Sequence, residues 1–365
     1  MSKPKTQKFV FAANPNLFGS VNCVTPKNEF IANRLSRAHQ LSFENLLRNC
    51  MESSADALFL YGPNIAAKPF TVSAQLFMRD CFEELASCGT KVRVIADTKF
   101  AETSHVINWG KNVRILSPVN GSQTPLFDEE IEHFICTGLT ANEQAFPQNL
   151  IAFHERSVEP GPVDSFFLSA GQDWQVTIDQ NSRSVSARLS GLQSVDFDES
   201  PSGALLIEKG ESVSTTSVDC GAVDLFSTVV NLSANTSLDD FLHHVSDLLH
   251  EAADGLRKPA LLRIALDGIA PSLSAPLNST TLFELCCEEF ADFFDQHQIW
   301  LDSVSFEPSA PRPVDDFPFS LDLERALQHF GIEQKSRILQ SADKRARLFI
   351  MGAFEELVGR ADSDN

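Results

Sequence analysis

Two asparagines stand at alternate positions just after the first apolar run of the sequence. The run Lys8–Ala13 reads as a short strand, and Asn14 and Asn16 follow it in a polar turn that reaches Gly19–Ser20. In an open α/β sheet, side chains just past the carboxyl end of such a strand point into the ligand crevice. Chemistry is therefore expected to start at Asn14 and Asn16.

An amide is a poor group for metal chemistry. Asp or His at these two positions would make a site for a hard cation, whereas an amide brings no charge and binds Mn²⁺ or Mg²⁺ only through a weak carbonyl oxygen. The stretch has the shape of a metal-binding strand end without its ligands. The sequence also has no Walker A, G-x-G-x-x-G or H-E-x-x-H motif, so we expect neither a metal nor another cofactor.

The composition favours a large chain without membrane segments. Its 365 residues suffice for a substantial core and two domains plus a tail. We expect no membrane association, because the sequence has no long uncharged apolar run and the polar Met1–Lys8 lacks the pattern of a signal peptide. The eight cysteines are scattered without a C-x-x-C pair, which predicts reduced thiols and a cytoplasmic location.

The charge argues against DNA binding by this chain alone. Its net charge is −20, from 29 basic and 49 acidic residues, whereas affinity for DNA comes largely from neutralising phosphates. Two basic groups could form local patches, although such groups are more often solvated surface. They are Lys91, Arg93, Lys99, Lys111 and Arg114, and Lys335, Arg337, Lys344, Arg345 and Arg347.

The order of elements predicts an α/β fold. Strands alternate with helices as far as Ser117, which requires right-handed crossovers and a parallel sheet. Residues 120–150 read as irregular, and the short strands after them are typical of the second half of a mixed sandwich. The expected helices are Glu29–Ser54 and Pro69–Cys88, and the expected strands are Ala55–Tyr61, Lys91–Ala96, Val113–Ser117, Asn149–Phe153, Ser165–Leu168, Gln175–Ile178, Ser184–Leu189 and Ala204–Glu208.

A second, smaller α/β domain is predicted after these strands, because strands and helices alternate again over about 80 residues. A proline-rich linker and two helical segments follow it. The predicted divisions are 1–225, 226–307, 308–320 and 321–365. The expected elements of the smaller domain are strands Leu225–Leu232, Ala260–Ala265 and Ile299–Phe306, and helices Ser237–Ala253 and Thr280–Gln296.

With these pieces in order, the chain resembles the calcineurin-like metallophosphoesterases, specifically the DNA-repair exonucleases of the SbcD/YhaO-like branch. LSFENLLRNCMESSADALFLYG looks like that family's first helix and second strand, and SGALLIEKGE with ALLRIALDGIAP looks like the passage into its capping domain. The resemblance covers nearly the whole chain. It implies a four-layer α/β/β/α sandwich, an α/β capping domain at 226–307 and a C-terminal helical tail.

The resemblance also implies where a two-metal phosphodiesterase centre would lie. Two cations that clamp a phosphodiester need carboxylates and imidazoles to hold them. Pro63 replaces the carboxylate that would bridge them, and only His154 stands where the family has a ligand, so the resemblance implies a pseudoenzyme. The family's metal motifs fall on Asn14, Asn16, Pro63, Ala66, Asp97, Thr98, His154, Ala170 and Gln172.

Four of the polar residues in this region have two interpretations each. Lys99 and Lys111 could contact phosphate, because a lysine charge can partly replace a lost metal, or they could be ordinary solvated lysines. His154 could be a surviving metal or phosphate contact, or a histidine bonded to backbone at a strand end. Asp97 could be an acid near a phosphate site or a turn-capping residue.

By this resemblance, the chain is a non-catalytic subunit of a DNA-repair or DNA-processing complex. The corresponding tail of the related exonucleases docks on an SMC-like coiled-coil ATPase. The apolar residues Leu348, Phe349 and Phe354 are the expected contacts, in a helix-in-groove mode, unless the helix packs on its own domain.

Two other functions stay open. One is a residual Mn²⁺- or Mg²⁺-dependent DNA exonuclease, and the other is an adaptor without a nucleic-acid role. DNA would be contacted only within a complex, and a homodimer is an open alternative.

Overall fold

The structure, a computed structural model, describes the chain between Thr6 and Phe306 with several gaps. The contacts divide the chain into two units, Met1–Glu307 and Pro308–Asn365. The predicted linker and tail, with Leu348, Phe349 and Phe354, lie outside the described residues. The residues outside the description are 1–5, 24–28, 63–64, 66–70, 97–99, 101, 103, 105–106, 118–125, 138–147, 155–163, 172, 196, 198–201, 234, 269–278 and 307–365.

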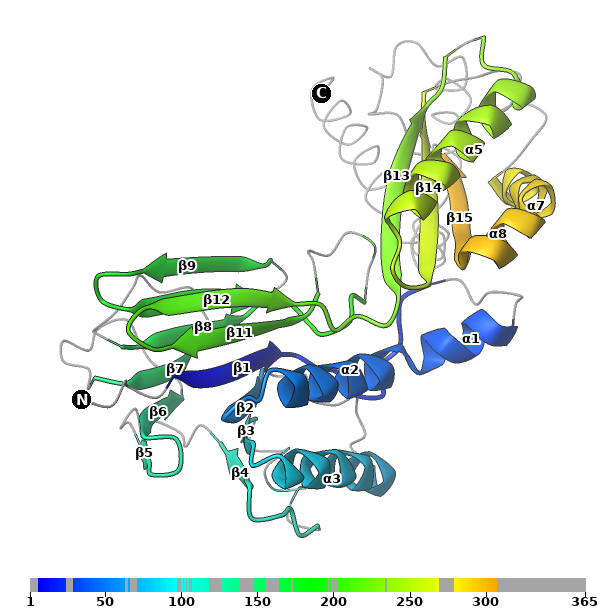
Figure 1. The fold of residues 1–365 in the computed structure, drawn as a ribbon. Coiled ribbons are helices and arrows are strands. Elements are labelled where there is room, and N and C mark those ends of the chain that lie inside the picture. Colours follow the sequence, from blue (N-terminus) through cyan, green and yellow to red (C-terminus); the bar gives the residue numbers. More distant parts are fainter. Residues whose placement is uncertain are drawn as a thin grey trace, which may run out of the picture. The chain divides into compact units, whose positions relative to one another are not determined.

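The first sheet has six strands in the order β12-β11-β1-β2-β3-β4 (Figure 1). Its four strands β1 to β4 run parallel, as the crossovers predict, and β11 pairs antiparallel with β1 and with β12. The bounds are β1 Gln7–Ala13, β2 Ala57–Tyr61, β3 Lys91–Ile95, β4 Val113–Leu116, β11 Ala204–Lys209 and β12 Val213–Val218.

The second sheet also has six strands, in the order β5-β6-β7-β8-β10-β9. Here β6, β7, β8 and β10 run parallel, and β5 and β9 are antiparallel edge strands. The bounds are β5 Leu126–Asp128, β6 His133–Thr137, β7 Leu150–His154, β8 Phe166–Ala170, β9 Gln175–Asp179 and β10 Ser184–Leu189.

Three strands depart from the sequence prediction. β5 and β6 lie within residues 120–150, which were expected to be irregular, and β12 was not expected. β5 is only three residues long, and β12 is a largely exposed, polar edge strand. Such segments become strands because a neighbour pairs with them, and tertiary pairing of this kind leaves little trace in a local pattern.

The strands of the first sheet are apolar on both faces. Alternate residues point to opposite faces of a strand, so Phe9 and Phe11 of β1 face the second sheet while Val10 and Ala12 face the helices. β2 follows the same rule. This double burial explains why both strands read as continuous apolar runs.

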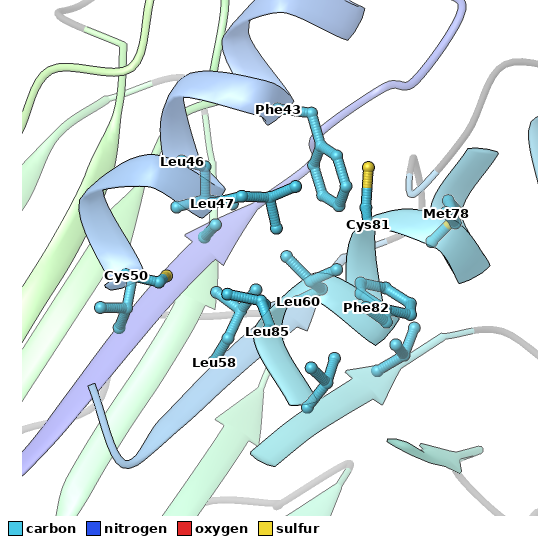
Figure 2. Close-up of a cluster of buried hydrophobic side chains, with 14 of the residues drawn as sticks. Phe43, Leu46, Leu47, Cys50, Leu58, Leu60, Met78, Cys81, Phe82 and Leu85 are labelled. Atoms are coloured by element: carbon cyan, nitrogen blue, oxygen red, sulfur yellow. The ribbon is translucent and has the colours of Figure 1, made fainter. Parts of the chain in front are cut away.

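Helices α2 (Ala38–Glu52) and α3 (Val72–Ser87) lie side by side on the outer face of the first sheet (Figure 1). Figure 2 shows Phe43 and Leu47 of α2 meeting Leu60 of β2. Each such buried side chain contributes about 1.5–3 kcal/mol. The predicted helix Glu29–Ser54 is two helices, because the backbone leaves helical geometry at Arg37 and α1 (Glu29–Ser36) packs into a different apolar cluster.

The smaller sheet has three parallel strands in the order β13-β14-β15. Its strands alternate with helices in the predicted order, except that the second helix breaks into α7 and α8 at Phe290. A capping box between Ser237 and Asp240 starts α5. The bounds are β13 Asp224–Asn231, α5 Leu238–Gly255, β14 Ala260–Asp267, α7 Ser279–Glu289, α8 Ala291–His297 and β15 Ile299–Phe306.

The predicted α/β class is confirmed, since helices cover one sheet and that sheet packs face to face on another. The outer face of the second sheet also carries buried residues, among them Leu150 and Phe167, and a fourth layer over them stays a prediction.

All eight cysteines are described, and none forms a disulfide. Within the described ranges, no helix combines the length and apolar character that a bilayer crossing needs.

Candidate functional site

The carboxyl ends of the parallel strands bring together residues from both large sheets. Asn14 follows β1, and its backbone N–H donates to the Tyr61 carbonyl at the end of β2 (2.9 Å). The Tyr61 hydroxyl donates across to the Ser169 carbonyl of β8 (2.9 Å). A Cβ on Gly191, just after β10, would lie 3.2 Å from the Asn14 carbonyl oxygen. We call Asn14, Tyr61, Gly62, Ser169 and Gly191 the strand-end site.

The two asparagines shape the turn but do not converge. Both adopt left-handed backbone conformations, with φ values of 41° at Asn14 and 46° at Asn16, which asparagine tolerates better than most residues. The Asn14 amide lies over Gly62, where a Cβ would collide with its oxygen. The Asn16 amide instead folds over Gly19, whose N–H donates to the Asn16 carbonyl (2.7 Å). Asn14 alone therefore belongs to the strand-end site.

Aromatic rings fill the space between the sheets at this edge. The ring of Tyr61 lies 5.0 Å from that of Phe153 in β7, and both side chains are almost wholly buried. Phe59 packs on the same Phe153 ring. Burial raises the pKa of Tyr61 well above its usual value, so the phenol stays protonated. Tyr61 can therefore donate a hydrogen bond here but cannot act as a phenolate.

A buried histidine behind the Asn14–Ser20 turn was missed by the sequence reasoning. His39 lies on α2 with 1% of its surface exposed. Burial lowers its pKa to about 4, although the carbonyls of Pro15 and Ser20 oppose this shift. Neither ring nitrogen makes a well-formed hydrogen bond within the described residues. The helical apolar spacing around His39 predicts a core position, but nothing in the sequence places that position behind this turn.

The structure describes only some of the predicted site residues. Ala170 ends β8 beside Ser169, and the backbone of His154 pairs with Ser169, so both strand positions lie at this edge. Lys111 precedes β4 and is exposed at the opposite, amino-terminal ends of the strands, so it is not brought to Asn14. The side chain of His154 lies outside the description, as do Pro63, Ala66, Asp97, Thr98, Lys99 and Gln172.

Three members of the first basic group share two carboxylates within the fold. Arg93 is fully buried, and its Nη2 donates to Asp128 (3.0 Å) and Glu130 (2.6 Å). Lys91 and Arg114 reach the same carboxylates, at 3.4–3.6 Å. Burial raises the pKa of Asp128, but hydrogen bonds and charge from Arg93 outweigh it and lower that pKa overall. These ion pairs join β3 and β4 to the second sheet, so all three cations have carboxylate partners within the fold.

The described donors do not fit a pair of divalent cations. The strand-end site offers an amide, a protonated phenol, the Ser169 hydroxyl and backbone groups, and none of its five residues carries an ionised side chain. No group of three or more His, Cys, Asp or Glu is arranged to hold a metal within the described residues. A two-metal centre needs anionic ligands to offset the repulsion between its cations. We therefore derive no metal-dependent step at this site.

Together, the two facing sheets and the three-stranded α/β unit define a mixed α/β protein with a neutral site at the carboxyl ends of its strands. No protein-family model matches the chain, and no curated protein matches it.

Proposed function

We propose that this chain is a non-catalytic relative of the calcineurin-like metallophosphoesterases, of the SbcD/YhaO-like branch, and serves as a subunit of a DNA-repair or DNA-processing complex. The proposal includes the finer fold: a four-layer sandwich, a capping domain formed around β13-β14-β15, and a helical tail. Its role is to act as a scaffold for an SMC-like coiled-coil ATPase, and DNA is contacted within the complex.

The observation that carries the proposal is the neutral strand-end site. In the related enzymes this edge holds two cations, whereas here Asn14 covers Gly62 and the Tyr61 and Phe153 rings occupy the space between the sheets. A buried aromatic pair strengthens packing but provides no ligand for a cation. This neutral lining supports the proposal that the chain has the scaffold of these enzymes without the donor set needed for phosphodiester hydrolysis.

Cleavage of linear duplex DNA in the presence of Mn²⁺ tests the loss of catalysis. We expect the full-length protein to leave the duplex intact, and His154→Ala to behave in the same way. Mn²⁺-dependent cleavage that disappears in His154→Ala would instead support a residual exonuclease with an altered metal site.

Binding to the ATPase tests the scaffold role. The tail segment 321–365 is the proposed docking element, and an apolar helix loses groove affinity when a buried contact becomes charged. We expect Phe354→Asp to weaken binding to an SMC-like coiled-coil ATPase. Undiminished binding by Leu348→Asp and Phe354→Asp would contradict the docking assignment.

A further inference from the structure

A hollow of about 470 Å³ lies where α1 meets the foot of the smaller domain, and basic residues line it. Arg34 comes from the last turn of α1, Arg257 and Lys258 follow α5, and His297 ends α8. The rest of its lining is Ala253, Leu256, Pro259, Gln296 and Gln298. We call this hollow the basic pocket.

The walls of the basic pocket are fixed by backbone hydrogen bonds. The Leu256 N–H donates to Ala253 (3.2 Å), and the Ala260 N–H donates to Gln298 (2.9 Å). The His297 ring stacks on Phe293 with centroids 4.3 Å apart. A site whose walls are already ordered loses less conformational entropy when a ligand binds.

The two arginines carry the available positive charge. Lys258 is neutralised by Asp219 (2.8 Å) and Asp224 (3.0 Å), whereas neither Arg34 nor Arg257 forms an ion pair within the described part of the chain. Arg34 donates to the Ala222 carbonyl (3.5 Å), and its Nε is buried without a hydrogen-bond partner among the described residues. A guanidinium presents five N–H donors in a fork that fits a phosphate.

A second hollow shows that the basic lining is a local feature. That hollow, of about 410 Å³, lies between α2 and α3 and combines Arg48 with Glu44, Asp80 and Glu84. The basic pocket has no Asp or Glu among its lining residues, although the whole chain carries a net charge of −20. The lining of the basic pocket is thus positive although the whole molecule is acidic, and local charge governs the potential in a concave site.

We propose that the basic pocket binds a phosphomonoester of nucleotide size, with Arg34 and Arg257 as the phosphate ligands. Its volume lies within the range of small-molecule sites, about 300–1,000 Å³. His297 and the side chains of Gln296 and Gln298 line the remaining space and supply polar contacts for the rest of the ligand. This inference does not rest on the proposed function.

Calorimetric titration of the full-length protein with adenosine 5′-monophosphate tests the proposal, with adenosine as the phosphate-free ligand. We expect adenosine 5′-monophosphate to bind, and adenosine to bind at least about tenfold more weakly, because a charge-assisted contact is lost. Arg257→Gln, an exposed position, should weaken binding of the monophosphate by about tenfold or more. Arg48→Gln removes an equivalent exposed charge from the second hollow and should leave the affinity unchanged.

A 5′-phosphorylated single-stranded oligonucleotide and its unphosphorylated form distinguish the source of the phosphate. If the phosphorylated oligonucleotide binds, its unphosphorylated form does not, and Arg257→Gln weakens the binding, the result would support the pocket. It would also identify a nucleic-acid end as the ligand. Arg257 could instead serve only to stabilise the carboxyl end of α5. Failure of both phosphorylated probes to bind, or affinity unchanged in Arg257→Gln, would overturn the proposal, whatever the variant does to thermal stability. Neither outcome bears on the proposed loss of catalysis.

Discussion

The two ends of the paired six-stranded sheets differ in how they use polar residues. At the carboxyl ends, the strand-end site is neutral and tightly packed. At the amino ends, Lys209 Nζ lies 2.6 Å from Asn149 Oδ1 and 3.3 Å from His133 Nε2, and Arg183 pairs with Asp164 (2.7 Å). We call His133, Asn149, Asp164, Arg183 and Lys209 the amino-end cluster.

Among the described side chains, each end buries one histidine, and the two environments differ. His133 accepts from Lys209 through Nε2, and its Nδ1 lies 2.7 Å from the Ile131 carbonyl, so its ring is held on both sides. His39, behind the Asn14–Ser20 turn, has no such pair of partners among the described residues. Burial lowers the pKa of both rings to about 4.

In this sandwich, charged side chains connect strands of the two sheets. Lys209 ends β11 of the first sheet and bonds to residues of the second, and Arg93 joins β3 to Asp128 in the same way. Both contacts cross between the sheets, whereas among the described residues the carboxyl ends are joined by the neutral bond from Tyr61 to Ser169. Within the described part of the chain, the bond that joins the two sheets at the carboxyl ends is thus neutral, and the ion pair there, Arg188 with Asp173 (3.7 Å), lies within the second sheet.

The largest effect is expected from Arg93→Ala. Removing a fully buried guanidinium leaves the buried Asp128 without its main partner, which costs about 3–5 kcal/mol of unfolding free energy. Urea denaturation measures the change. Arg79→Ala removes an exposed pair with Asp80 and should cost less than about 1 kcal/mol. A loss below about 1 kcal/mol for Arg93→Ala would show that charge does not fasten the sheets.

The two buried histidines predict a loss of stability in mild acid. Since each folded pKa (about 4) lies below the ordinary value of 6.5, the unfolded chain binds protons first as the pH falls. The contribution of the two rings to the free energy of unfolding is fully present above about pH 6.5. It declines toward pH 4, by about 3 kcal/mol for each ring.

Unfolding free energies measured between pH 4 and 7 test this prediction. His39→Leu and His133→Leu should each flatten the decline, whereas His244→Leu, exposed on α5, should not. If only His133→Leu flattens the decline, the loss of stability in acid comes from the amino ends of the strands and not from the carboxyl ends. Equal slopes in the wild type and both buried variants would contradict the burial argument.

A smaller effect is expected from Tyr61→Phe. The change keeps the ring packing on Phe153 but removes the donor to the Ser169 carbonyl, which costs about 1–2 kcal/mol. Chemical denaturation provides the measurement, with the exposed Phe226→Leu as the control. An unchanged stability would mean that the neutral bond between the sheets contributes nothing.

The sequence predicted the regular part of the fold well because apolar periodicity is a local signal. β10 and β15 have the predicted bounds, and β3 ends one residue early. The breaks at Arg37 and Phe290 were not predicted. At Arg37 the two segments pack into different apolar clusters, whereas α7 and α8 pack into the same one. Nothing in the local pattern of residues 120–150 marks β5 and β6.

The site was predictable only in part. The strand pattern predicted Asn14 at a strand end, and the resemblance implied that His154 and Ala170 lie near it. The structure places all three positions at the carboxyl ends of their strands. The role of His39 and the pairing of Arg93 with Asp128 depend on contacts between segments far apart in the chain. Such contacts cannot be derived from the spacing of residues in one sequence.

Calorimetric titration of the full-length protein with Mn²⁺ tests the central claim most directly. The neutral strand-end site predicts no saturable binding of metal ions at this edge and no change in thermal unfolding when Mn²⁺ is added. Tight binding of two ions per chain, weakened by His154→Ala, would contradict the account and would show that this edge still assembles a two-metal centre.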